Sequence, residues 1–153
     1  MHEWHLIVYC LLHSHSNIPF RLFITVAVYG AILGGMEKKA LQIANELNEI
    51  VNEEMFNEFP DLVAYLESYS ALEVHAMIRF GLWKELLELE SPKNSNLMLF
   101  RAASIKFARA LAYAALGNVA EARKEADNFD SLRGNPDSKV RILHNNTLAD
   151  LFA

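Results

Sequence analysis

The chain has 153 residues, of which 52% are hydrophobic and 22% charged, a length and composition that suit one domain with its own core. Its formal net charge of −5 gives no overall attraction to nucleic acid or to anionic lipid, so we expect a protein or peptide partner. Cys10 is the only cysteine, which excludes an intrachain disulfide and a cysteine-based zinc site and fits a cytoplasmic protein.

Residues 1–19 are predicted only as an N-terminal helical segment of uncertain extent. They begin "MHEWH", without the basic region or small-residue cleavage site of a signal peptide. This segment contains four histidines, and the only other potential metal ligands near them are Glu3 and Cys10: His2, His5, His13 and His15. The spacing of the histidines matches no zinc pattern. We therefore predict no metal and no cofactor.

The uncharged run "LFITVAVYGAILGGM", residues 22–36, allows two interpretations. As a helix it would be roughly 22 Å long, whereas a hydrocarbon layer is about 30 Å thick. Its Gly30 and Gly34 have the spacing of packed transmembrane helices, but the short length favours a fully buried helix of a helical domain. We predict this first helix over residues 20–34 and consider membrane insertion the weaker interpretation.

Three amphipathic helices are predicted, each directly after a glycine. Residues 37–51 place on one face Ala40, Ile43, Ala44, Leu47, Ile50 and Val51. A short helix after Gly81 has Trp83, Leu86 and Leu87 inward and ends before Ser91 and Pro92. The helix after Gly117 has an inward face of Val119, Ala122, Ala126, Phe129 and Leu132, with Gly134 as a left-handed cap.

A more apolar helix precedes each amphipathic one, over residues 20–34, 71–80 and 97–116. Ser70 and Glu73 have the spacing of a capping box for the second of these, and Asn94 or Ser95 is the predicted N-cap of the third. β-branched alternation is nearly absent, so the predicted fold class is all-α.

Gly35, Gly81 and Gly117 each separate an apolar helix from an amphipathic one, which predicts three antiparallel helical hairpins with glycine at the turn. The glycines are 46 and 36 residues apart (81 − 35 and 117 − 81). This spacing is close to a helical-repeat period of about 34 residues with one insertion.

The segments "LGGMEKKALQIANEL", "RFGLWKELLEL" and "ALAYAALGNVAEARKEADNF" resemble degenerate tetratricopeptide repeats. The resemblance spans residues 20–152 and implies an α-solenoid domain, residues 20–153, of about three hairpins plus a C-terminal helix. It also implies a protein-binding scaffold whose concave face carries Thr25, Tyr29, His75, Arg79, Ser104, Phe107 and Leu111. His75 and Arg79 could instead be partly buried polar groups of a hairpin. The alternative function is a structural segment of a larger repeat protein that packs against itself or a neighbouring domain.

The sequence predicts a C-terminal helix from Asp137 to Phe152 with apolar residues on two faces, which favours self-association through this helix or a missing downstream repeat. Val140, Leu143 and Leu151 form one face, with Leu148 and Phe152 on the other.

Enzyme activity is not predicted, because no phosphate loop occurs and Ser104 and His75 are not brought together by any sequence pattern.

Overall fold

The computed structural model describes residues 18–135, 139, 142–143 and 146–151. In this part of the chain the fold is helical, apart from one ladder of two-residue strands. The principal helices are α2 (Ile18–Leu33), α3 (Glu37–Asn48), α6 (Leu72–Phe80), α7 (Trp83–Glu88), α8 (Leu99–Ala115) and α9 (Val119–Arg133). The segment between α3 and α6 contains α4 (Glu53–Glu58), η1 (Pro60–Leu62), α5 (Val63–Leu66) and η2 (Glu67–Ala71).

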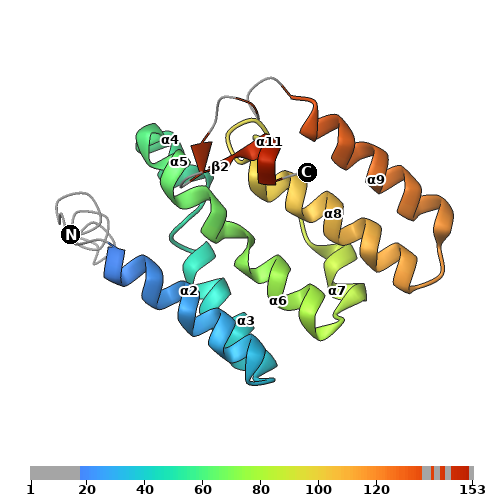
Figure 1. Ribbon diagram of the computed structural model, residues 1–153, viewed down its shortest axis with the longest axis horizontal. Helices are drawn as coiled ribbons and strands as arrows, with labels where there is room; N and C mark the ends of the chain where they lie inside the picture. Colours follow the sequence, from blue (N-terminus) through green and yellow to red (C-terminus); the bar gives the residue numbers. More distant parts are fainter. Residues whose placement is uncertain (1–17, 136–138, 140–141, 144–145, 152–153) are drawn as a thin grey trace.

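The helices on either side of each turn glycine contact one another, α2 with α3, α6 with α7, and α8 with α9 (Figure 1). Gly35, Gly81 and Gly117 stand between the paired helices with φ of 68°, 69° and 81°. This left-handed conformation is costly for residues with a Cβ and open to glycine. The glycines therefore end the first helix of each hairpin and reverse the chain.

Successive hairpins pack on one another along the molecule. The second helix of each hairpin contacts the first helix of the next, α3 against α6 and α7 against α8. The first helices also contact one another, α2 against α6 and α6 against α8. As a result, α2 and α9 lie at opposite edges of the array (Figure 1).

Buried apolar side chains join these layers into a core. The largest cluster connects α2, α3 and α6 with the segment between them, and a second connects α6, α7 and α8. The predicted inward face of α3 is confirmed, because Ala40, Ala44 and Leu47 are buried. In α7, Leu86 is the fully buried residue, as expected from the same spacing.

Two predictions for α2 and α6 need correction. Helix α2 is not fully buried, since 58% of Val26 and 80% of Leu33 are exposed. The capping box at Ser70 and Glu73 does not form, because the Ser70 hydroxyl donates to the Glu67 carbonyl and Glu73 pairs with other helices. The N-cap of α8 is Met98 and not Asn94 or Ser95, although the Asn94 side chain accepts from Leu97 N at 3.1 Å in the turn before the helix. None of the helices in the described ranges is long and apolar enough to span a bilayer.

The inward face predicted for α9 is also wrong in part. Val119 is 58% exposed and Ala126 is exposed, whereas Glu125 is buried. The Glu125 carboxylate lies 3.4 Å from Lys106 Nζ on α8, so the inward face includes an ion pair that apolar periodicity cannot reveal. Gly134 has φ −72° and its N–H continues the helical bonding to Asp130, so it is not a left-handed cap.

In the described part of the predicted C-terminal helix, Lys139 is helical, but two short strands and a single helical turn follow instead of one continuous helix. Strands β1 (Ile142–Leu143) and β2 (Asn146–Thr147) pair antiparallel, and α11 covers only Leu148–Leu151. Thr147 starts this turn, because its Oγ1 accepts from Asp150 N while Asp150 Oδ2 accepts from Thr147 N. Leu148 is fully buried beside Leu99 and Ala103, so it is not an exposed contact for self-association. Val140 and Phe152 lie outside the described residues.

Candidate functional site

The predicted site residues all lie on the first helices of the three hairpins and are called here the first-helix row: Thr25, Tyr29, His75, Arg79, Ser104, Phe107 and Leu111. Tyr29, His75 and Leu111 stand at the same place in α2, α6 and α8, six residues before the turn glycine (35 − 29, 81 − 75 and 117 − 111). All seven side chains are exposed or half-buried. Because α2, α6 and α8 are neighbours, the row crosses three helices.

Tyr29 and His75 are the pair that the structure brings into direct contact. The Tyr29 hydroxyl oxygen lies 2.8 Å from His75 Nδ1, and the two ring centroids are 6.2 Å apart. Burial raises the pKa of Tyr29 and lowers the pKa of His75, so both groups are uncharged at neutral pH. One hydrogen bond between neutral side chains therefore links the first two hairpins at their exposed surface.

Arg79 follows His75 by one turn and is exposed. It stands in the last turn of α6, where a cation is favoured by the carbonyl end of the helix. A guanidinium in this position offers several N–H donors to an incoming carbonyl or carboxylate. The α2–α6 part of the row is thus aromatic and rich in donors.

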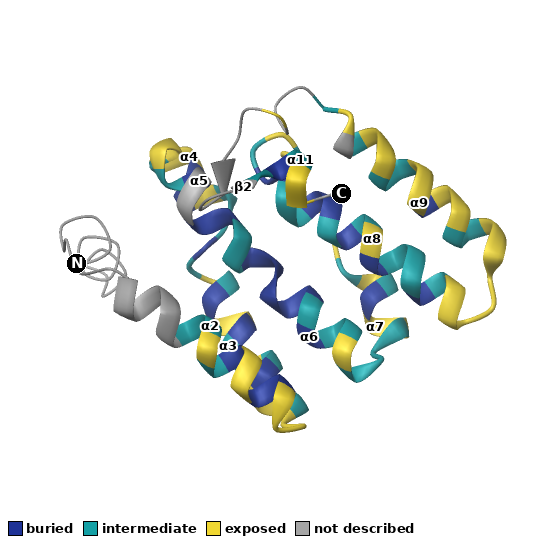
Figure 2. Ribbon diagram, in the orientation of Figure 1, coloured by how far each residue is buried: buried dark blue, intermediate teal, exposed yellow. Residues whose placement is uncertain are grey.

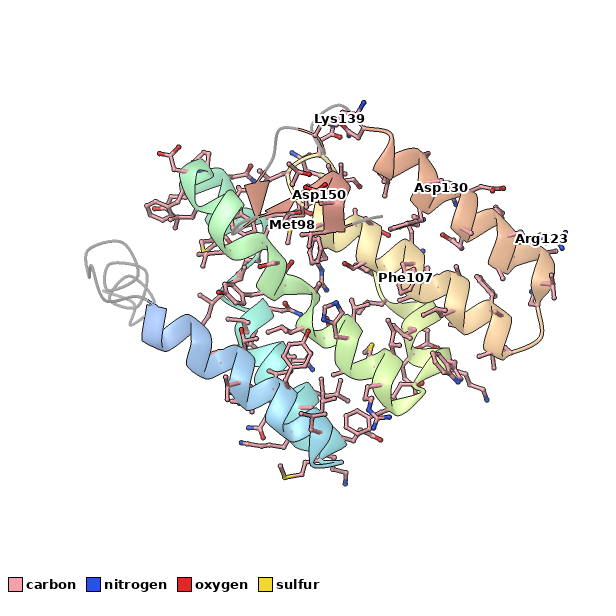
Figure 3. All side chains as sticks on the ribbon, in the orientation of Figure 1. Met98, Phe107, Arg123, Asp130, Lys139 and Asp150 are labelled. Carbon is pink, nitrogen blue, oxygen red and sulfur yellow. The ribbon has the colours of Figure 1, made fainter. Side chains whose placement is uncertain are left out.

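The α8 part of the row is mainly apolar. Phe107 (Figure 3) is 47% exposed, and its ring centroid lies 5.9 Å from that of Phe129 on α9. Leu111 is half-buried one turn further along. The Ser104 hydroxyl donates to the Phe100 carbonyl at 2.7 Å within its own helix, so this oxygen is directed to the helix backbone and not to His75.

A polar cluster between α3, α6 and α8 was not predicted from the sequence. Glu73 on α6 accepts from Asn48 Nδ2 at 2.8 Å and pairs with Arg101 on α8 at 3.0 Å. Arg101 also donates to the Ser70 carbonyl. These bonds tie the end of α3 and the starts of α6 and α8 to one another. The partners are 25 and 28 residues apart in sequence, so no local spacing could have indicated them.

Glu67 is a further residue that sequence reasoning missed. Its side chain is fully buried, and its Oε1 accepts from the Phe100 backbone N–H at the start of α8. A carboxylate at the start of a helix is favoured by the helix dipole. Within the described residues no three His, Cys, Asp or Glu side chains are grouped as a metal site. The N-terminal histidines lie outside the described residues.

Comparison of the chain with protein-family models, with curated proteins and with solved structures gave no match.

Proposed function

We propose that the chain is a protein-binding scaffold that uses the first-helix row as its binding surface, within a helical-repeat array of the tetratricopeptide type. The observation that carries the proposal is the alignment of Tyr29, His75 and Leu111, which stand at one position of three neighbouring helices and are all accessible. These three positions are neither in loops nor fully buried. Turn formation and core packing therefore do not explain why aromatic, imidazole and alkyl groups occur there together. We place the protein in the cytoplasm as part of this proposal.

The chemistry of the row favours an extended or helical segment with both polar and apolar anchors. Arg79 and the Tyr29–His75 pair would bond peptide carbonyls or a carboxylate, while Phe107 and Leu111 would cover an apolar side chain. Aromatic and arginine side chains contribute most strongly to binding energy at protein interfaces. A clamp for a C-terminal carboxylate is not expected, because the row does not contain the clustered lysine, arginine and asparagine side chains that such a clamp needs.

Affinity capture of the partner with the unmodified chain and with Arg79→Glu tests the proposal. Lys84→Glu is the matched control, since Lys84 is exposed on α7 outside the row and the charge change is the same. We expect Arg79→Glu to lose the partner, and Lys84→Glu to retain it. Equal recovery with both variants, after circular dichroism has confirmed folding, would exclude the row as the binding surface.

A further inference from the structure

The hydrogen bond between Tyr29 and His75 limits what the first-helix row can offer to a partner. In the neutral pair a single proton lies between the Tyr29 hydroxyl oxygen and His75 Nδ1, which are 2.8 Å apart. Either Tyr29 donates this proton and His75 keeps a free Nε2–H, or His75 donates it and Tyr29 keeps a free O–H. In both tautomers the neutral pair therefore has one donor left for a partner.

Protonation of His75 changes the number of free donors. Both ring nitrogens of an imidazolium carry hydrogen, so Nδ1 would donate to the Tyr29 oxygen, and the bond between the two hairpins would be kept with its direction reversed. The Tyr29 O–H and the His75 Nε2–H would then both be free. The protonated pair thus offers two donors and a positive charge, which suit an anionic group.

Arg79 adds a second cation beside His75. It follows His75 by four residues on α6, a spacing that makes two side chains neighbours on a helix, and it is the one exposed residue of this helix (Figure 2). Among the described residues Arg79 has no hydrogen bond or ion pair. The other cations of α6 and α8 are engaged within the protein: Arg101 with Glu73, Lys106 with Glu125, and Arg109 with the Leu89 carbonyl.

In the described part of the chain, no carboxylate of the protein itself pairs with His75. The row contains no Asp or Glu, and the described side chains of α2, residues 24–33, are uncharged. The elements that pack on α6 are α2, α3, α7, α8 and η2. On η2, Glu67 bonds to the Phe100 N–H and Tyr69 packs in the core. The remaining charged or titratable side chains of α3, α7 and α8 are exposed or half-buried and are not bonded to His75: Glu37, Lys38, Lys39, Glu46, Lys84, Glu85, Glu88 and Tyr113.

We propose that the partner of the first-helix row places an acidic side chain against Arg79 and the Tyr29–His75 pair, and that His75 takes up a proton from solvent as this side chain binds. The inference rests on the proposed function and defines the chemistry of its partner. A carboxylate matches a single guanidinium, whereas phosphorylated segments are typically bound by clusters of arginines. The row has one arginine, so a carboxylate is the better fit.

The coupling gives the affinity a pH dependence of defined sign. Burial holds the pKa of His75 below its usual value in the free protein, and a carboxylate beside the imidazolium would raise this pKa in the complex. The affinity should therefore increase as the pH falls through the pKa of the complex, by up to about tenfold per pH unit. The carboxylate of the partner, with a pKa of about 4, stays charged over this range.

A randomised peptide library displayed on phage and selected on the unmodified chain at about pH 6 tests the partner chemistry. Each selected peptide is then compared with a counterpart in which amides replace its carboxylates. Fluorescence anisotropy from about pH 7.5 to about pH 6 measures their binding to the unmodified chain, His75→Gln and Arg79→Gln. Lys84→Gln removes the same charge outside the row and is the matched control. Phe107→Ala reports use of the row independently of charge, and circular dichroism checks that every variant is folded.

We expect the selected peptides to contain Asp or Glu. Their amide counterparts, and the Arg79→Gln variant, should bind at least about tenfold more weakly, while Lys84→Gln should bind as the unmodified chain does. Binding to the unmodified chain should tighten severalfold toward pH 6, and binding to His75→Gln should not.

Two kinds of failure are distinguishable. Selected peptides that are weakened by Phe107→Ala but contain no acidic residue would overturn this inference and leave the proposed function standing. An affinity that is independent of pH, or a pH dependence that persists in His75→Gln, would do the same. Selection that yields no peptide, or only peptides that neither Phe107→Ala nor Arg79→Gln weakens, would contradict the proposed function as well.

Discussion

Gly117 provides a direct test of the hairpin turns. It has φ +81°, and a Cβ added there would meet no atom within 4 Å. The cost of a substitution is therefore the cost of the backbone conformation alone, without a packing term. For alanine in the left-handed region this is about 1–2 kcal/mol, and for valine, whose branched Cβ is excluded more strongly, about 3 kcal/mol.

The expected effect is measurable by thermal and urea denaturation followed by circular dichroism. For a chain of this size about 1 kcal/mol corresponds to roughly 2–4 °C, so Gly117→Val should lower the melting temperature by about 6–12 °C and Gly117→Ala by less. Gly134→Ala is the matched control, because Gly134 has φ −72° and an added Cβ there makes only ordinary contacts. It should leave stability unchanged or raise it by about 0.5 kcal/mol.

The reasoning would be refuted if Gly117→Val had the same melting temperature as the unmodified protein. It would be refuted equally if Gly134→Ala cost as much as Gly117→Ala, since the positive φ would then not be the source of the loss.

Three further predictions concern polar side chains. In urea denaturation, Glu73→Leu should lower the free energy of unfolding by about 2 kcal/mol or more, because Arg101 loses its carboxylate partner. Arg101→Leu should cost much less in the Glu73→Leu variant than in the unmodified chain. Burial holds the pKa of His75 below its usual 6.5. The unfolded chain therefore binds the proton at higher pH than the folded chain does, and stability should fall as the pH drops below about 6.5. In denaturation curves, His75→Gln should flatten this dependence. Thr147→Val should cost about 1 kcal/mol and, in an NMR titration, should raise the pKa of Asp150, which the Thr147 hydroxyl now lowers.

Local signals predicted the hairpins because each of them acts within one or two turns. The glycine before an amphipathic run and the spacing of Ala40, Ala44 and Leu47 suffice to place α3 and its buried face. The same reasoning failed on α9, where Glu125 is buried in an ion pair with Lys106 on another helix while Ala126 is exposed.

Long-range and cap-specific interactions account for the other differences. The Glu73 carboxylate bonds to Asn48 and Arg101 and does not cap the start of its own helix. Which of these bonds forms depends on tertiary packing. The C-terminal error had a signal in the sequence, because Thr147 and Asp150 have the spacing of a capping box and mark Leu148 as a helix start. The apolar periodicity continues through that point and therefore predicted one longer helix. For the first-helix row, alignment predicted its members but could not predict the hydrogen bond between Tyr29 and His75.

The central claim is that the first-helix row binds a polypeptide partner. Its most direct test is a photo-crosslinking phenylalanine analogue placed at Tyr29 or at Phe107, with Asn57, exposed on α4, as the control position. We predict that positions 29 and 107 crosslink to the same partner polypeptide, that position 57 does not, and that Arg79→Glu abolishes both crosslinks. Crosslinks of equal yield at position 57, or none at positions 29 and 107 while the partner is still captured, would contradict the account.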